Sequence, residues 1–316
     1  MTTLSPLRTR GTVGPDPRGP VRPVPAWRAR VSRLAAPLGL TPFATYVLLF
    51  LALPTVLAIG TGLFDKHGAF TWSNLSALGD PVVLRTFRNS ITLSAVSAAV
   101  SAAVGAIVGA LVCVAALGLR EGGFARGLLE SAASVIAQFG GVMLAFAFIA
   151  TIGLRGMVTV WLRQSFGIDI FASGAWIYAM PGLYLPYIYF QVPMMVITFL
   201  PALTALRPQW AEATLTLGGT PRTFWARVAV PVLAPSFLAS FLLLFANAFS
   251  SYATAAALAS QGAQIVPLQI RAALTSETVL GRQNLAGALA LGMVVVMALV
   301  MWAYSAVQRR AARWQR

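Results

Sequence analysis

The sequence has few charged residues and almost none of the residues that form disulfides or hold metals. Only 10% of its 316 residues are charged, whereas soluble domains carry about 25%. It contains one cysteine, Cys113, and one histidine, His67. We therefore expect no disulfide framework, no metal-binding cluster and no cofactor held by this chain.

The sequence also lacks the loop that binds nucleotide phosphates. Lys66 is the only lysine, and no Gly-x-x-x-x-Gly-Lys-Ser/Thr pattern leads up to it. That pattern supplies the backbone N–H groups and the lysine that hold the phosphates of ATP. The chain is therefore predicted not to be an enzyme, and any ATP and magnesium would be bound by a partner.

Long apolar runs are what the sequence does contain. Hydrophobic residues make up 58% of the chain and the mean hydropathy is +0.77, which together predict a membrane protein. A bilayer core about 30 Å thick takes roughly 20 helical residues. Six runs of this kind lie near residues 41–64, 89–119, 131–154, 173–200, 233–259 and 286–307. The predicted fold class is all-α, with six transmembrane helices.

Basic residues outnumber acidic ones and set the predicted orientation. The formal net charge is +15, but no basic face is interleaved with stacking aromatics, so we expect no nucleic-acid partner. With the N-terminus inside, 16 of the 23 basic residues fall on the cytoplasmic side and 7 outside. The positive-inside rule then predicts a multi-pass protein of a prokaryotic plasma membrane, with both termini in the cytoplasm.

The chain divides by composition into a basic tail, a membrane domain and a short second tail. Residues 1–33 hold seven arginines among repeated Pro and Gly, and are expected to be a disordered cytoplasmic tail. Residues 34–69 hold the first transmembrane helix and the start of an outer loop. A membrane domain is expected over 70–308, followed by a basic tail at 309–316.

No energy source for transport is visible inside the predicted spans. Proton or sodium coupling usually uses an intramembrane carboxylate, and the six runs contain none. A potassium-type filter sequence is also absent. The favoured interpretation is a membrane passage for a solute whose energy comes from a partner protein. Two alternatives to it stay open. One is an ion-coupled secondary carrier or half-transporter with six spans, and the other is an export-type subunit.

A polar segment between the fourth and fifth runs has the features of a docking element. Ala211, Ala213 and Leu215 favour a helix, and Gly218-Gly219 ends it. Thr220-Pro221 then predicts an N-cap and a first-turn proline for a second short helix, which continues through Phe224, Trp225 and Val228. The segment is therefore expected to be a bent finger of two helices.

This finger resembles the cytoplasmic signature of the permease subunits of ABC-type importers, of the type I or MetI-like fold. The signature reads Glu-Ala-Ala, three residues, Gly, nine residues, a branched apolar residue, one residue, and Leu-Pro. Here its positions are Glu212-Ala213-Thr214, Gly218, Val228 and Val230-Pro231. Thr214 replaces the second alanine, and Val230 replaces the leucine. The resemblance covers about residues 70–308.

The resemblance implies that residues 208–219 form a coupling helix seated in a cleft of a separate ABC ATPase dimer. Glu212 would bond to groups of that cleft, Ala213 would allow close approach, and Gly218 would permit the bend. Thr214, Gly219 and Arg222 complete the candidate coupling site. The implied partners are that ATPase, a second permease subunit of the same or a different chain, an extracytoplasmic solute-binding protein and membrane lipid.

Residues 247–254 and 265–270 are similar to permeases of the spermidine/putrescine, phosphonate, thiamine and ferric-iron group. Sugar permeases usually carry Asp where this chain has Leu217. The resemblance therefore implies a small polar or charged solute, with a polyamine as the candidate. The Trp72 region and residues 87–90 are similar to the family's lateral outer helix and the Asn-Ser pair that begins its core spans.

Four polar residues in the predicted spans are candidates for the solute path: Gln138, Gln191, Asn247 and Tyr252. The alternative for each is an interhelical hydrogen bond, worth about 0.6 kcal/mol in a membrane bundle, and for Gln138 we favour that alternative. Asn247 and Tyr252 are expected in one apolar helix and are the best candidates.

Small residues and prolines predict how the spans pack. Small side chains let helix backbones approach closely, and they recur in the second and third runs at Ser97, Ser101, Gly105, Gly109, Gly140 and Gly141. The fourth run, with Pro181, Pro186 and Pro193, is expected to be kinked or partly unwound. Residues 157–166 are expected to form a short interfacial helix.

Overall fold

A computed structural model of the 316-residue chain describes residues 40–64, 69–72, 76–117, 124–258, 264–275 and 282–314. The predicted basic tail at 1–33, Lys66 and His67 lie outside these ranges. The chain divides into two compact units, Met1–Val56 and Leu57–Arg316. In the first unit the described residues are helical from Leu40, with a π-helical stretch η1 at Leu48–Ala52.

The described residues form helices and no named strand, apart from one isolated bridge between Phe64 and Phe70. Six helical segments of this part of the chain are long and apolar enough to cross a membrane. They are Leu40–Thr61, Pro81–Val112, Gly141–Phe166, Met180–Thr204, Pro221–Ser250 and Leu285–Arg309. The all-α prediction with six apolar helices is confirmed, although the third segment differs from the predicted one.

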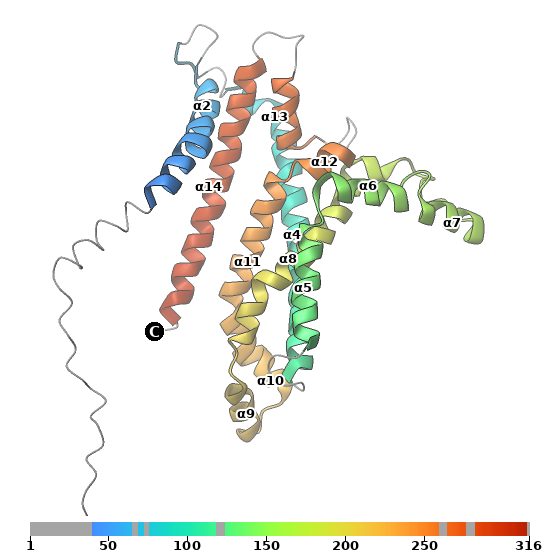
Figure 1. The fold of residues 1–316 in the computed structure, drawn as a ribbon, viewed down its shortest axis with the longest axis vertical. Coiled ribbons are helices and arrows are strands. Elements are labelled where there is room, and N and C mark those ends of the chain that lie inside the picture. The colour runs from blue at the N-terminus through green and yellow to red at the C-terminus, as the bar shows by residue number, and fades with distance from the viewer. Residues whose placement is uncertain are drawn as a thin grey trace, which may run out of the picture. The chain divides into compact units, whose positions relative to one another are not determined.

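In the second unit a group of long helices runs side by side (Figure 1). They are α4 (Pro81–Leu117), α8 (Met180–Thr204), α11 (Val230–Ser250) and α14 (Arg282–Trp314). The shorter α5 (Phe124–Gln138) packs along α8. We call the end of this bundle that carries α9 (Pro208–Thr216) and α10 (Pro221–Phe224) the lower end. The upper end carries α12 (Ala253–Leu258) and α13 (Val266–Leu274).

Small residues on α4 allow it to pack tightly against α8, as predicted. A Cβ added at Gly105 would lie 2.6 Å from the Met195 Cβ and 2.8 Å from the Val192 carbonyl oxygen. One added at Gly109 would lie 3.0 Å from a methyl carbon of Leu203. The glycines on this face therefore set the distance between the two helices.

The second span begins earlier than predicted. Helix α4 starts at Pro81, where the Asp80 carboxylate accepts a hydrogen bond of 2.7 Å from the N–H of Val82. A proline at the first position and a capping aspartate before it are typical of a helix start. Residues 81–88 are therefore continuous with the span, and Asn89 and Ser90 lie within it rather than at its beginning.

The predicted continuous third span at 131–154 is wrong. Helix α5 ends at Gln138, and α6 (Gly141–Ile152) begins after a break at which Gly141 has φ of +69°. Nothing lies within 4 Å of a Cβ added at Gly140, so this glycine pair turns the chain and does not serve close packing. Glycine is the residue that reaches such a φ without steric cost.

The fourth and fifth spans also have different bounds. Helix α8 is one continuous α-helix across Pro186 and Pro193, with Pro181 in its first turn, so of the predicted kink or partial unwinding the unwinding does not occur. Helix α11 stops at Ser250, and Ser251 is extended with ψ of 113°. The buried Tyr187 of α8 donates a hydrogen bond of 2.8 Å to the Ser251 carbonyl, which fixes this corner.

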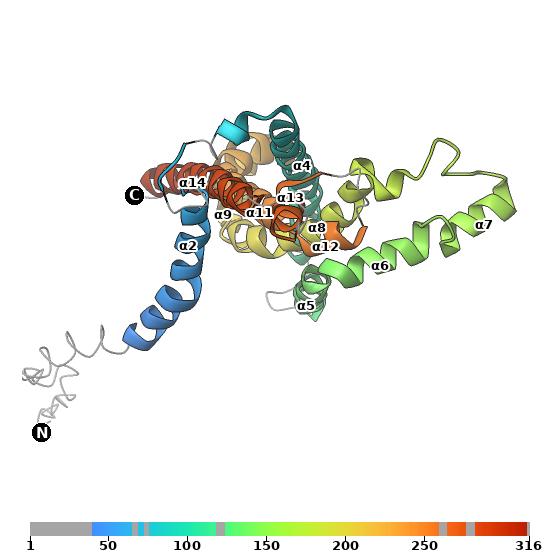
Figure 2. The same cartoon turned by 90° about the horizontal axis from the view of Figure 1, so that it is seen from above.

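Helices α6 and α7 (Met157–Phe166) leave the bundle sideways (Figures 1 and 2). The predicted short helix at 157–166 is present. We call residues 141–166 the lateral arm. Its base packs against α12 and α8, where Leu144 and Ala145 are buried in one cluster with Ala255 and Leu258.

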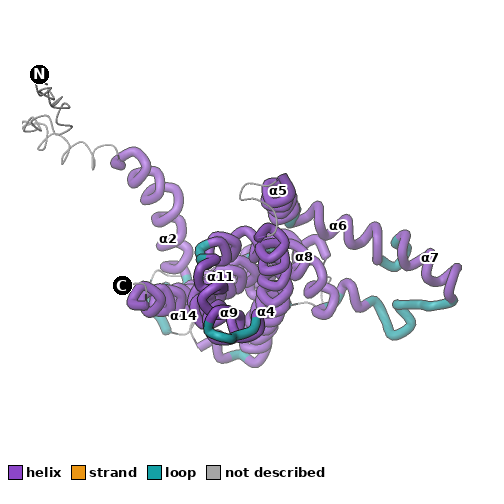
Figure 3. Tube along the Cα trace, turned by 90° about the horizontal axis from the view of Figure 1, so that it is seen from below, coloured by secondary structure: helices purple, strands orange, loops and turns teal. Residues whose placement is uncertain are grey.

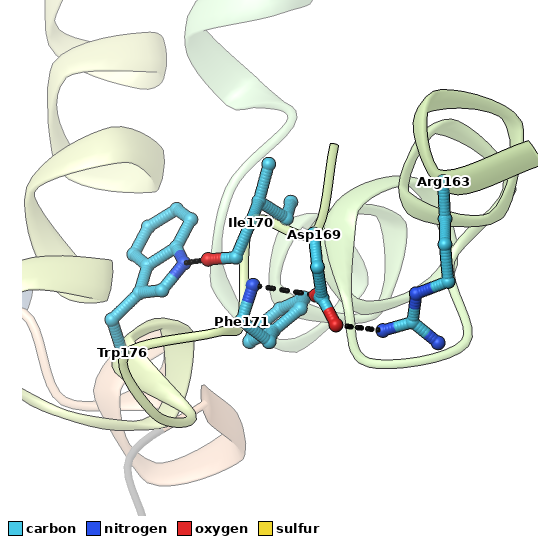
Figure 4. A network of polar contacts seen from close by, with 5 residues as sticks. All are labelled: Arg163, Asp169, Ile170, Phe171 and Trp176. Carbon is cyan, nitrogen blue, oxygen red and sulfur yellow. Dashed lines mark hydrogen bonds and ion pairs between the residues drawn. The ribbon is translucent and has the colours of Figure 1, made fainter. Parts of the chain in front are cut away.

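The chain returns from the lateral arm through a loop held by its own side chains (Figure 4). Asp169 accepts hydrogen bonds of 2.9 Å from the Phe171 N–H and from the Arg163 guanidinium. The Trp176 Nε1–H donates to the Ile170 carbonyl at 2.9 Å, and its indole stacks on Phe171. The Phe171 N–H, and next the Arg163 guanidinium, hold the pKa of Asp169 below its ordinary value.

Candidate functional site

The predicted finger forms at the lower end of the bundle. Its first helix, α9, begins at Pro208 after Arg207 and ends at Thr216. None of its residues is buried, so α9 stands clear of the rest of the bundle, and Figure 3 views the bundle from this end. A helix of 9 residues is too short to be stable in water by itself, so its ends must hold it.

Two glycines close the first helix with a Schellman motif. Gly218, at φ +78°, donates its N–H to the Leu215 carbonyl at 3.0 Å. Gly219 donates to the Thr214 carbonyl at 2.9 Å. These two bonds satisfy carbonyls that the helix end leaves unpaired. A Cβ at Gly219 would lie 2.7 Å from the Thr214 Cγ2, so this position also needs glycine.

A capping box opens the second helix, as the Thr220-Pro221 pair predicted. The Thr220 hydroxyl accepts from the Thr223 N–H at 3.4 Å, and the Thr223 hydroxyl accepts from the Thr220 N–H at 3.3 Å. Pro221 occupies the first turn. Helix α10 then passes through a π-helical turn, η4 (Trp225–Ala229), directly into α11. Backbone helix therefore continues from Pro221 to Ser250.

The second leg of the finger is anchored in the bundle, whereas the first is not. Phe224 and Trp225 pack against a buried cluster that includes Ala229, Leu233 and Leu203. The bend and α9 are therefore presented at the end of a rod that is continuous with α11.

The candidate coupling residues gather on this finger and are open to contact. Glu212, Ala213, Gly218 and Arg222 are exposed, and Thr214 and Gly219 are partly buried beneath the bend. The side chains of Glu212 and Arg222 make no hydrogen bond or ion pair with any described residue. Large apolar side chains are exposed beside them, with Leu215 at 53% and Leu217 at 88%. An exposed carboxylate among exposed apolar side chains suits a surface that another protein covers.

The four candidate path residues do not meet in one site. Gln191 of α8 is fully buried, and its Nε2 donates to the Ser97 hydroxyl of α4 at 3.0 Å. Its Oε1 has no partner among the described residues. One turn along α8, the Met194 sulfur accepts from Asn247 Nδ2 of α11 at 3.5 Å. Gln191 and Asn247 thus link helices in this conformation.

Gln138 and Tyr252 lie apart from that pair. Gln138 is the exposed last residue of α5. Tyr252 follows the end of α11, so the expectation that it shares a helix with Asn247 is wrong. Its hydroxyl accepts a hydrogen bond from Arg271 of α13, whose guanidinium carbon lies 5.7 Å from the tyrosine ring centre.

Sequence reasoning missed the contacts that tie α13 to α4 at the upper end. The Ser90 hydroxyl accepts from the Val266 N–H at 2.8 Å. The Thr86 hydroxyl donates to Gln269 Oε1 at 2.6 Å, and Asn89 Nδ2 donates to the Gln264 carbonyl at 3.2 Å. These pairs are more than 170 residues apart in sequence, so no local pattern signals them.

The described residues contain no group of three or more His, Cys, Asp or Glu side chains that could hold a metal ion.

Basic side chains lie at both ends of the bundle. Arg207, Arg222 and Arg227 belong to the finger, while Arg163 and Arg271 belong to the lateral arm and the upper end.

Neither a protein-family model nor a curated protein sequence matches this chain. Solved structures do match. A chain of a bacterial ABC transporter involved in the import of the acidic polysaccharide alginate superposes with a TM-score of 0.70 and 16% identity, over 90% of this chain and 98% of that one. The chain has the fold of an ABC importer permease.

A second match to this permease fold is a chain of a bacterial alginate ABC transporter in complex with its alginate pentasaccharide-bound periplasmic protein. It gives a TM-score of 0.69 and 15% identity, covering 90% of this chain and 96% of that chain. A chain of the MetNI methionine ABC transporter, in an inward-facing conformation, gives a TM-score of 0.47 and 15% identity over 73% of this chain and 99% of that one. Since six helical segments of the described residues are long and apolar enough to cross a membrane, the chain is a multi-pass membrane protein.

Proposed function

We propose that the chain is the permease subunit of an ABC importer and forms half of a transmembrane path. The observation that carries this proposal is the exposed finger at the lower end of a bundle with the permease fold. Since the sequence has no phosphate-binding loop for ATP, the energy for transport comes from a separate ATPase dimer.

In this proposal the finger is the element that the ATPase holds, and the lower end of the bundle is cytoplasmic. Glu212 bonds to groups in a cleft of the ATPase, Ala213 lets α9 approach its wall, and Gly218 makes the bend. Gly219, Thr214 and Arg222 support that shape or line its edge. Closure of the ATPase on ATP draws two such fingers together and switches the two permeases between two rigid arrangements.

The solute is a small polar or charged molecule, for which we take a polyamine as the first candidate. One of the similar transporters is involved in the import of an acidic polysaccharide, a solute of a different class from a polyamine. The solute reaches the path from an extracytoplasmic binding protein. Asn247, Gln191, Tyr252 and Gln138 remain the candidate path residues, and Gln191 and Asn247 would have to exchange their interhelical bonds to contact it.

The proposal is tested by purifying the tagged full-length chain from its native membranes and measuring ATP hydrolysis by the complex in liposomes. We expect an ATPase and a solute-binding protein to co-purify. Glu212→Ala should abolish solute-stimulated hydrolysis while the protein still inserts, and Glu212→Gln should retain part of it. Gln209→Ala, on the same exposed helix, is the matched control and should behave as the wild type.

Two results would overturn the proposal. One is normal stimulated hydrolysis by Glu212→Ala in a complex whose ATPase is bound. The other is solute uptake by the purified chain alone in vesicles under an ion gradient, which would make it a secondary carrier.

A further inference from the structure

The lateral arm carries apolar side chains that nothing in the described chain covers. On α6 the face opposite the bundle exposes Val142 by 45%, Met143 by 67% and Phe146 by 58%. On α7, Met157 and Trp161 are exposed by 72% and 55%. Side chains of this size need an apolar environment, and what supplies it depends on the level at which the arm leaves the bundle.

The length of α5 sets that level. Helices α4 and α8 both run from the upper to the lower end (Figure 1), so the chain must cross the membrane upward once between Leu117 and Met180. Helix α5 has 15 residues and rises about 22 Å, less than the roughly 30 Å of a bilayer core. Arg126 and Glu130 occupy its first half, so its apolar part is shorter still. The chain therefore turns into α6 before the crossing is complete.

The composition of the arm changes along its length as expected for a segment that leaves the bundle within the bilayer and ends at the headgroups. Helix α6 has no charged residue, and the hydroxyl of Thr151 donates to the Ala147 carbonyl at 2.8 Å. Such a helix exposes no unpaired polar group to lipid. Helix α7 is amphipathic, with exposed Met157 and Trp161 next to Arg163. Tryptophan and arginine are enriched where the acyl chains meet the headgroups.

The type of side chain on the arm favours lipid over a protein neighbour. Where α4 contacts α8, the contact uses small residues, at Gly105 and Ser97 of α4. Small and hydrogen-bonding residues are what helix interfaces in membranes require. The outward face of α6 instead carries Val142, Met143 and Phe146 and no polar group.

We propose that the lateral arm is a lipid-embedded element of the leaflet at the upper end of the bundle. Helix α6 lies among the acyl chains, and α7 lies at the level of the headgroups of the same leaflet. Residues 141–166, which have the length and apolarity of a span, would then not cross the membrane. This inference needs only the membrane-spanning bundle and does not depend on coupling to an ATPase.

The test places an environment-sensitive fluorophore on single cysteines in a Cys113→Ser background. The full-length chain, with any permease subunit that co-purifies but without the ATPase that the finger would contact, is reconstituted into phosphatidylcholine vesicles. Met143→Cys reports on α6 and Trp161→Cys on α7. Leu299→Cys, on the outward face of α14, is the control for acyl-chain contact, and Leu217→Cys on the finger is the control for water. Quenching is measured with phosphatidylcholine brominated near mid-chain or near the glycerol, and with aqueous iodide.

We expect the Met143 probe to lose as much fluorescence to brominated lipid as the Leu299 probe, and to resist iodide. The Trp161 probe should be quenched best by lipid brominated near the glycerol and in part by iodide. Quenching of the Met143 probe by iodide as strong as at Leu217 would place α6 in water and refute the proposal. Protection of the Met143 probe from both quenchers would also refute it, because another subunit would then cover the arm.

Discussion

The bend of the finger offers a sharp test, because its two glycines are required for different reasons. Gly218 has φ of +78°, and nothing lies within 4 Å of a Cβ added there. A side chain at 218 therefore meets only backbone strain. A Cβ at Gly219 would lie 2.7 Å from the Thr214 Cγ2 and 2.8 Å from its carbonyl oxygen. A side chain at 219 therefore meets a steric clash.

The strain at Gly218 can be given a magnitude. A left-handed conformation costs an ordinary L-residue roughly 1–2 kcal/mol, and asparagine less. This corresponds to a change of about 5- to 30-fold in a conformational equilibrium. Helix α9 has no buried residue and is marginal by its length. Most of the loss should therefore appear as a lower population of the bent finger, and as weaker binding of whatever recognises it.

The assay is binding of the purified ATPase subunit to vesicles that carry the permease, followed by flotation. Gly218→Ala should raise the apparent Kd by up to about 5- to 30-fold, Gly218→Val should raise it more, and Gly218→Asn should stay near the wild type. Gly219→Ala should also weaken binding. Adding Thr214→Ser to it should restore binding only in part, because the contact with the carbonyl remains. Equal affinities for Gly218→Val and Gly218→Asn would refute the reasoning, because the bend would then not need a positive φ.

Two further predictions concern the bundle and the returning loop. Gly105→Ala should lower the free energy of unfolding in detergent by about 1–3 kcal/mol, and the melting temperature with it, because its Cβ would lie 2.6 Å from the Met195 Cβ. Gly127→Ala, with nothing within 4 Å of the new Cβ, is the control, and equal melting temperatures for the two would contradict the packing argument. The lowered pKa of Asp169 means that its carboxylate stabilises the loop above the unfolded pKa of about 3.9 and loses that effect as the pH falls through the folded value. Amide exchange at Phe171, corrected for intrinsic rates, should be constant through the neutral range and rise only in acid, whereas Asp169→Asn should raise it at neutral pH.

The finger could be predicted from the sequence because its structure is set by local chemistry. Gly218 supplies a backbone angle that other residues reach at a cost, and Thr220-Pro221 supplies a cap and a fixed φ. Both signals act within four residues of the bond they determine. The close packing at Gly105 was predictable for a related reason, since small residues on one helix face have few other uses in a membrane.

The third span could not be predicted because the hydropathy of a segment does not show whether the chain turns within it. The apolar run continues through Phe139 and Gly140 into α6, although the chain turns there, and a glycine pair can serve either close packing or a turn. The corner after Ser250 was missed for the same reason. It depends on a hydrogen bond from Tyr187, 64 residues away, which no local pattern reveals.

The helix that begins at Pro221 continues unbroken to Ser250, and this has a mechanical consequence. The Thr220 cap fixes one end of this helix, and the hydrogen bond from Tyr187 to the Ser251 carbonyl fixes the other. A displacement of the finger is therefore passed along the helix with little change in its shape. The π-helical turn at Trp225–Ala229 is the one place along this helix where a turn contains an extra residue compared with an α-helical turn. A displacement of the finger should therefore reach the Tyr187 corner as a translation or a rotation of the whole helix, of which the π-helical turn and Pro235, inside α11, would absorb part.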